Sequence, residues 1–249
     1  MHEVVALAAG MENDSTEGVD RAGSSAFLTS LQLADSFFPS GLYTLSYGLE
    51  AFAQSGLLRA NGLEALLMDY LRHAVGPSDG AALACAHRGI ETGDLDVAAE
   101  ADIRLAGVKL PKEARTSSQR LGRQLLKTAV IVFGGELIAS YLDHVNRSEL
   151  PGNHSVALGL IAAAHGVERE QAVMGELYAF ASGALAASVR LAVIDHLFAQ
   201  AVLHRLKPVI SEVGLRQCES RVQDIAGSAP LIDIMAMQHE RASLRLFVS

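Results

Sequence analysis

Histidine and acidic side chains are the residues in this sequence that could bind a metal ion or carry out acid–base chemistry. A catalytic zinc site on a helix commonly uses two histidines four residues apart, or a glutamate three residues before a histidine. The nine histidines are His2, His73, His87, His144, His154, His165, His196, His204 and His239. None of them has either spacing. The sequence therefore predicts no resident metal site and no metal-dependent hydrolysis.

Lysine is the other residue type that could indicate an enzyme, because nucleotide hydrolysis often depends on it. The phosphate-binding loop G-x-x-x-x-G-K-[ST] places a lysine directly after a glycine. No lysine in this chain follows a glycine. We therefore expect no nucleotide hydrolysis by that route, and we assign no catalytic residue from the sequence.

Composition and charge narrow the class of protein further. Half of the 249 residues are apolar and 19% are charged, which indicates a globular chain with a large core. The formal net charge is −8, and no run of basic residues interrupts the acidic balance. Because nucleic-acid binding depends on neutralising phosphates, we expect no nucleic-acid partner.

The expected cellular location follows from the cysteines and the apolar segments. Cys85 and Cys218 form no C-x-x-C motif, so neither a disulfide framework nor a zinc ribbon is predicted, and a reducing cytoplasm fits best. The most apolar stretch, 178–203, contains Arg190, Asp195 and His196, which are costly in a membrane. We interpret it as a buried helix and expect no membrane association.

The elements that would position any site are predicted to be helices. Alanine and leucine recur at spacings of three and four, which indicates an all-α fold with one multi-helix domain of about ten helices over residues 26–249. Residues 1–25 show no period and are expected to be a disordered, mobile leader. Residues 228–249 are expected to form an apolar, partner-binding tail.

Glycine and proline positions predict where the helices end. A helix over 63–71 is expected to stop at Gly76-Pro77, with Ser78-Asp79 opening the next one. Residues 168–206 are expected to form one long central helix, or two helices with a kink near Ser182-Gly183, ended by Lys207-Pro208. Gly122 lies within a helical pattern, so we expect a neighbouring backbone to approach it closely.

Four blocks of residues occur in order along the chain. They are P-S-G-L-Y at 39–43 with S-Y-G-L-E at 46–50, R-x-x-S-x-x-L-G at 115–122, V-R-L at 189–191 with a later glutamine, and H-E at 239–240 with R-L-F-x-S at 245–249. Together they resemble the signature of the urease accessory protein UreF family over roughly residues 28–249. The residues that match family motifs, with structural or interface roles, are Pro39, Gly41, Gly48, Glu50, Arg115, Ser118, Gly122, Arg190, Gln200, His239 and Glu240.

The resemblance implies a function without chemistry of its own. It implies a cytoplasmic urease accessory protein, a chaperone for nickel insertion that forms a homodimer and binds the accessory protein UreD, also called UreH. It further implies recruitment or regulation of the GTPase UreG at apo-urease, with nickel only in transit and no stably bound cofactor. The positions that match implied contacts with UreD are Tyr43, Leu244, Arg245, Leu246 and Phe247.

The sequence departs from the family pattern at two places. Leu42 replaces the second glycine of the usual P-x-G-G turn, and residues 193–195 replace a Pro-Leu-Gly break after the third block.

Two other functions are alternatives to the one that the resemblance implies. A helical scaffold or interaction protein for another partner is the main alternative function. A helical metal-dependent hydrolase is the less favoured alternative, because the ligand spacings are missing.

Overall fold

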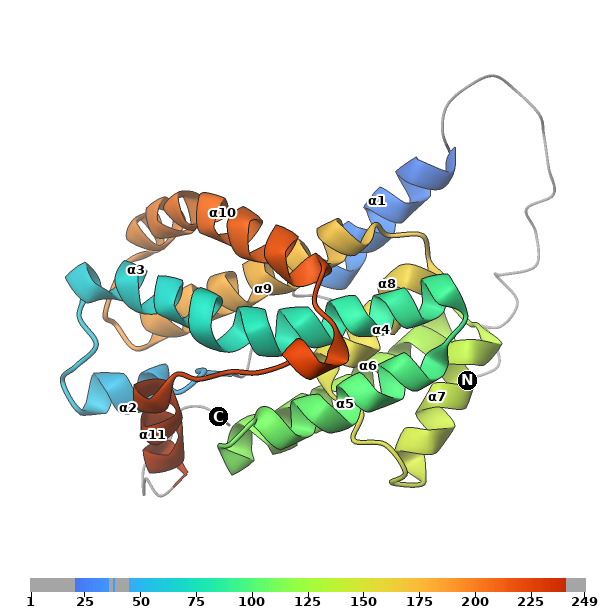
Figure 1. Cartoon of the computed structure of the whole chain (residues 1–249). Helices are drawn as coiled ribbons and strands as arrows, with labels where there is room; N and C mark the ends of the chain where they lie inside the picture. The colour runs from blue at the N-terminus through green and yellow to red at the C-terminus, as the bar shows by residue number, and fades with distance from the viewer. Residues whose placement is uncertain (1–20, 36–37, 39–44, 241–249) are drawn as a thin grey trace.

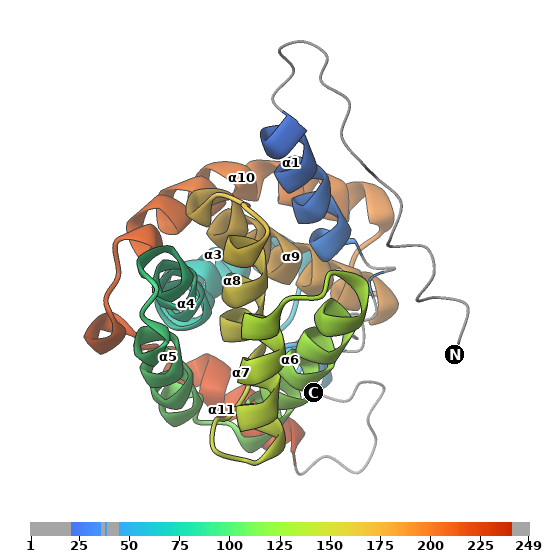
Figure 2. The same cartoon turned by 90° about the vertical axis from the view of Figure 1, so that its right-hand side faces the viewer.

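A computed structural model describes residues 21–35, 38 and 45–240 of the chain. Within these residues the chain forms helices and turns and contains no strand, so the predicted all-α class is confirmed for this part. The helices pack into one globular unit (Figures 1 and 2). In chain order they are α1 (Arg21–Ala34), α2 (Leu49–Gln54), α3 (Ala60–Asp69), the π-helix η3 (Tyr70–Gly80), α4 (Ala81–Thr92), α5 (Leu95–Val108), α6 (Lys112–Val132), α7 (Glu136–Asn146), α8 (His154–Ala164), α9 (Arg169–Arg190), α10 (His196–Cys218), the 3₁₀ turn η4 (Val222–Asp224) and α11 (Pro230–His239).

Helix α8 lies near the middle of the molecule and joins two apolar cores. One core is built mainly from α2, α3, η3, α9 and α10, and the other mainly from α4 to α8. The side chain of Leu158 packs against both cores. A Cβ at Gly159 would lie 2.5 Å from the carbonyl oxygen of Leu83, so this glycine lets α4 and α8 pack closely. The centre of the fold is therefore fixed by small side chains.

The helix that was predicted to stop at Gly76-Pro77 does not stop there. Helices α3, η3 and α4 form one continuous helix over 60–92, whose middle eleven residues have π geometry. Proline within a helix removes a backbone donor and crowds the preceding turn. In this protein two backbone N–H groups from outside the helix donate hydrogen bonds to carbonyl oxygens of η3. Ser228 N donates to His73 O and Ala226 N to Pro77 O, each at 3.0 Å.

Helices α9 and α10 correct the prediction for residues 168–206. The chain breaks at 191–195, where Ala192 has a φ of 56°, and not near Ser182-Gly183. Asp195 then caps α10, since its Oδ1 accepts a hydrogen bond of 2.7 Å from Phe198 N. The predicted end at Lys207-Pro208 is also wrong, because α10 continues through Pro208 to Cys218. Buried side chains on both sides of this proline hold the helix in place.

The most apolar long helix is α9, and by length and composition it could cross a membrane. Half of its most apolar 18-residue stretch is buried inside the protein. The core helix of a soluble protein can have the same length and composition, so these two properties of α9 are weak evidence for a membrane span.

The two ends of the chain can be compared with the expected leader and tail over part of their lengths. Helix α1 begins at Arg21, inside the range 1–25 that was expected to be disordered. Residues 1–20 lie outside the described part of the chain. At the other end, α11 occupies the first half of the expected tail, and residues 241–249 again lie outside the description.

Candidate functional site

A buried histidine joins the fourth motif block to the first and contacts Glu113, two residues before the second block. The side chain of His239, at the end of α11, is 1% exposed. Its Nε2 lies 2.9 Å from Oε2 of Glu50 in α2, and its Nδ1 lies 2.9 Å from Oε2 of Glu113 at the start of α6. We call this arrangement the Glu50–His239–Glu113 clamp. It joins elements that are 126 and 189 residues apart in sequence.

The two contacts of the clamp need two protons. A neutral imidazole has one N–H donor, whereas the protonated ring has two. Both ring nitrogens of His239 face carboxyl oxygens, so both contacts are hydrogen bonds when the ring is an imidazolium or when a carboxyl group donates its own proton to the ring. Glu50 is 2% exposed, so its contact with His239 is held away from water.

The neighbouring motif residues support the clamp from the backbone. Gly48 has a φ of 79°, a conformation that favours glycine, and it forms the N-cap of α2 two residues before Glu50. Glu240 Oε1 accepts a hydrogen bond of 3.0 Å from the backbone N–H of Glu113. This places an acidic group at the start of α6, where the helix dipole favours it.

The central motif on α6 fixes adjacent helix ends. Arg115 Nη1 donates to the backbone oxygens of Lys109 at 2.6 Å and Leu110 at 3.3 Å, just after α5 ends. Ser118 Oγ accepts a hydrogen bond of 3.3 Å from His154 N at the start of α8. A Cβ at Gly122 would collide with the backbone of residues 152–154. The predicted close approach at Gly122 is confirmed, and these three residues contact backbone groups inside the fold.

Two motif residues lie apart from this region. Arg190, at the end of α9, and Gln200, in α10, are both exposed. They do not join the clamp. The remaining predicted site residues lie outside the described part of the chain: Pro39, Gly41, Tyr43, Leu244, Arg245, Leu246 and Phe247.

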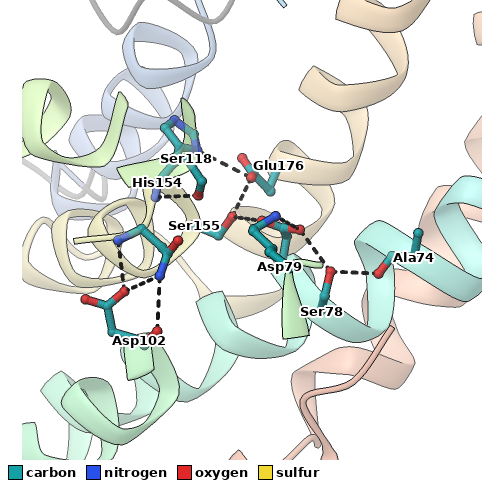
Figure 3. Close-up of polar contacts among 10 residues, drawn as sticks. Ala74, Ser78, Asp79, Asp102, Ser118, His154, Ser155 and Glu176 are labelled. Atoms are coloured by element: carbon teal, nitrogen blue, oxygen red, sulfur yellow. Dashed lines mark hydrogen bonds and ion pairs between the residues drawn. The ribbon is translucent and has the colours of Figure 1, made fainter. Parts of the chain in front are cut away.

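A cavity of about 190 Å³ lies beside the clamp and has one polar side. His239 and Glu113 line it together with residues of η3, α6, α8, α9 and α11. Its polar side holds Asp79 and Glu176, two buried acidic residues that the sequence analysis did not identify as site residues (Figure 3). Ser78-Asp79 was interpreted as a helix start, and Glu176 lies in the apolar face of α9, so neither position suggested a site.

Asp79 is the centre of a buried hydrogen-bond network. Its Oδ2 accepts bonds of 2.7 Å from Lys109 Nζ and 2.9 Å from Ser78 Oγ, and its Oδ1 lies 2.8 Å from Ser155 Oγ. Burial alone would raise the pKa of Asp79, but the Lys109 ammonium and these hydrogen bonds outweigh it and hold the pKa below its ordinary value. Asp79 is therefore a stabilised carboxylate with its own counter-ion.

Ser155 connects this network to a second acid. Its Oγ also lies 2.8 Å from Glu176 Oε1, and His154 Nδ1 lies 3.4 Å from the same oxygen. A hydroxyl has a single proton to donate, so Ser155 can donate to only one of the two acids at a time. Ser155 therefore links Asp79 and Glu176 at the wall of the cavity.

Tyr47 shows that the cavity wall is strained. It has a φ of 54°, which is unusual for a residue other than glycine. Its ring packs edge-on against Phe180, and its carbonyl oxygen accepts a hydrogen bond of 2.6 Å from Tyr70 Oη. Burial and the carboxylates of Glu176 and Asp79 raise the pKa of Tyr47, so its phenol stays neutral.

Asp102 positions the start of α8 and therefore the polar wall. Its carboxylate accepts bonds from Gly152 N at 2.7 Å, Asn153 N at 2.8 Å, Asn153 Nδ2 at 2.7 Å and Tyr141 Oη at 2.9 Å. Burial raises the pKa of Asp102, while these four donors favour its charged form. We call Asp102 and these donors the Asp102 hub; Figure 3 shows Asp102 in the same region as the Asp79 network.

The cavity wall does not contain a recognisable catalytic centre. Gly76–Gly80 reads G-x-S-x-G, a match that the sequence analysis missed, but it lies in the π-helix and not in the strand–turn–helix that exposes a nucleophile. Ser78 Oγ lies 2.7 Å from the Ala74 carbonyl oxygen and has no histidine partner among the described residues. Within the same residues, no group of three or more His, Cys, Asp or Glu side chains is arranged to hold a metal ion.

Comparison with known proteins agrees with the motif blocks. Residues 58–207 match the UreF family. The urease accessory protein UreF of Trichodesmium erythraeum is 31% identical over 227 residues, covering 89% of this chain and 96% of the relative. UreF 2 of Brucella canis is 29% identical over 220 residues, covering 88% and 90%, and UreF of Yersinia enterocolitica is 28% identical over 218 residues, covering 87% and 95%. The chain belongs to the urease accessory protein UreF family.

Proposed function

We propose that this chain is a non-catalytic assembly factor that binds a UreD/UreH-type accessory protein and recruits or regulates a UreG-type GTPase during nickel insertion into apo-urease. Its membership of the UreF family supports a role in urease maturation. GTP hydrolysis then belongs to the partner, because this sequence lacks the phosphate-binding loop. Nickel is the cargo of the complex, and this chain holds no cofactor of its own.

The observation that carries the proposal is the convergence of the motif blocks at the Glu50–His239–Glu113 clamp. The clamp joins Glu50, which follows the stretch 39–44 in sequence, to His239, which precedes the stretch 241–249. These two stretches of sequence contain every residue that we assign to partner binding, Tyr43 and residues 244–247. The contact between Glu50 and His239 brings together described residues that are close in sequence to both stretches, which supports a single partner that contacts both.

The proposal also covers the setting of the complex. We propose that the chain acts in the cytoplasm as a homodimer. The two described cysteines are free and buried, which suits a reducing compartment. Arginine and exposed apolar side chains are both common in protein interfaces. Light scattering of the purified chain measures the oligomeric state directly.

Co-expression with the UreD-type protein of the same organism, followed by size-exclusion chromatography with light scattering, tests the partner. The full chain should form a stable complex. A variant that combines Leu244→Ser, Leu246→Ser and Phe247→Ser should not form it, although its circular dichroism spectrum should still be that of a helical protein. A matched control replaces three exposed apolar residues elsewhere, Leu57, Ile131 and Leu197, which are 61%, 76% and 83% exposed. The control should keep the complex.

Three results would redirect the assignment. Normal binding by the tail variant would show that residues 244–247 are not the contact. Failure of the full chain to bind any urease accessory protein would favour the alternative function, a helical scaffold for a different partner. Stoichiometric metal in the purified chain, lost on a single histidine substitution, would favour the metal-dependent hydrolase.

A further inference from the structure

Helix α11 is attached to the rest of the fold by unusually little apolar burial. Of its ten residues, Met235 and His239 are buried. Leu231, Ile234 and Met237 expose 56%, 51% and 38% of their surfaces. Burial of apolar surface is the main force that holds a surface helix to a core. Polar contacts must therefore contribute a large share of what seats α11.

The start of α11 is anchored through the backbone. Residues 225–229 run extended below the long helix 60–92 before α11 begins (Figure 1). Ile225 is fully buried, and the N–H groups of Ala226 and Ser228 donate to carbonyls of η3 at 3.0 Å. Residues 225–229, which we call the strap, are held by these hydrogen bonds to η3, the π-helix that contains Pro77.

The end of α11 is held by the clamp. His239 inserts between carboxylates of α2 and α6, the two helices with which α11 makes most of its contacts. Burying such charges is costly, so a buried ion group contributes less net stability than apolar packing, yet removing one member is strongly destabilising. The best-attested use of such groups is to fix one arrangement among several.

Between its two anchors, α11 forms one wall of the cavity. Ile232, Asp233, Ala236 and His239 line the cavity from α11. Asp79, Lys109 and Glu176 line the same cavity from outside α11. Among the described residues, α11 contributes Met235 to one apolar core and packs Ile232 against it, so movement of α11 would open the cavity at the expense of these two apolar contacts and leave the second core intact.

We propose that α11 is a hinged wall: the Glu50–His239–Glu113 clamp holds it shut, and loss of the clamp lets α11 swing about the strap and opens the cavity while the other helices stay folded. This inference concerns the chain alone. It stands or falls independently of the partners assigned above.

Hydrogen exchange of the full chain tests the hinge. His239→Gln removes the imidazole ring, whose two nitrogens face the carboxyl groups of Glu50 and Glu113, and keeps a polar side chain of similar reach. Amides of 231–239 should then exchange on the order of 100-fold faster, as expected for breaking a buried ion group, while amides of α8 keep their protection. The control is His144→Gln, which removes an exposed histidine 2.6 Å from Glu149 and should change neither segment.

Thiol labelling tests the opening of the cavity. Ser117 lines the cavity and is 6% exposed, so a Ser117→Cys chain should react slowly with a thiol reagent. Adding His239→Gln should speed this reaction at least as much as it speeds exchange in α11. Cys85 and Cys218 are buried, and the His239→Gln chain without the new cysteine measures their background.

Three outcomes would overturn the hinge. They are unchanged exchange in α11, loss of protection in α8 and α11 together, and equally fast labelling of the new thiol with and without His239. If the His239→Gln chain does not fold, Glu113→Gln replaces it, because this carboxylate is 22% exposed and its loss is milder. A folded Glu113→Gln chain must then show faster exchange confined to α11, or the proposal fails.

Discussion

The Asp102 hub and the Glu50–His239–Glu113 clamp both bury carboxylates, but they stabilise them in different ways. Asp102 has four neutral donors, two of them backbone N–H groups, and no cation takes part in those bonds. The clamp pairs two carboxyl groups with the two nitrogens of one histidine ring. The hub lies where α8 is packed on nearly all sides, whereas the clamp holds a thinly packed terminal helix.

The difference suggests a rule for reading buried charge in this fold. Backbone N–H donors bind a buried carboxylate where the packing of the helices must not change, because removing the carboxylate leaves several N–H groups unpaired. Contacts between charged side chains occur where a single helix is held against the fold and could be released. The predictions below test whether the hub is the rigid member of the pair, from the largest expected effect to the smallest.

Replacing Asp102 should give the largest loss of stability. Asp102→Ala leaves the N–H groups of Gly152 and Asn153 without their acceptor, and we expect a loss of about 4 kcal/mol in the free energy of unfolding. Urea denaturation measures it. Asp143→Ala, at an exposed helical position, is the control and should stay within about 0.5 kcal/mol. A loss at Asp102 no larger than at the control would remove the distinction between hub and clamp.

Crowding the backbone that the hub positions should have the next largest effect. A methyl group at Gly122 meets the backbone of residues 152–154, so Gly122→Ala should cost about 2 kcal/mol through overpacking. Gly107→Ala is the matched control, since a Cβ there meets nothing within 4 Å and alanine favours a helix. The control should be neutral or slightly stabilising in the same denaturation experiment.

Arg115 should have a smaller effect, because it bonds to carbonyls at the surface side of α5 and α6. Arg115→Ala removes two hydrogen bonds, of 2.6 and 3.3 Å, and should cost about 1 kcal/mol. Arg120→Ala, an exposed arginine one and a half turns along the same helix, should cost less. Equal losses would mean that Arg115 contributes through charge alone.

The pH dependence of stability should separate two buried carboxyl groups with opposite shifts. The pKa of Asp79 is below its ordinary value of 3.8, so its contribution to stability is present above that pH and is lost as pH falls through the lowered pKa. The pKa of Asp102 is raised by burial, so ionisation lowers stability as pH rises from 3.8 through the raised pKa. The two residues should therefore give opposite pH slopes.

Denaturation of the wild-type, Asp79→Asn and Asp102→Asn chains across the acid range measures these slopes. The stability advantage of the wild type over Asp79→Asn should grow with rising pH. Its advantage over Asp102→Asn should shrink at higher pH, from 3.8 through the raised pKa of Asp102. Parallel slopes would show that the Lys109 ammonium does not control the charge of Asp79.

The helical fold could be predicted from sequence because periodicity and small residues are local signals. Leucine and alanine spacing revealed the helices, and Gly122 revealed a close approach. Pro77 and Pro208 misled the prediction of helix ends, because external donors and buried neighbours keep both prolines inside helices. Those compensations come from residues distant in sequence, so no local pattern contains them.

The candidate site was only partly predictable for the same reason. Glu50 and His239 were identified as motif residues, but their pairing was not, since 189 residues separate them. Glu113 was missed although it lies two residues before the recognised Arg115. Asp79 looked like a helix start, and only the folded chain brings Ser155, 76 residues away, to its carboxylate.

The π-helix η3 fixes the angle, measured around the helix axis, between the buried face of α3 and the buried face of α4. It lies between α3, which faces one core, and α4, whose Ala82, Cys85 and Ala86 face the other. One residue corresponds to about 100° of rotation around an α-helix axis. Deleting a single residue from η3 would rotate α4 relative to α3, so its alanine face would turn away from α8 and its Leu83 and Ala84 would turn away from the first core. The eleven residues of η3 thus act as a spacer of fixed angle, and their number matters as much as their chemistry.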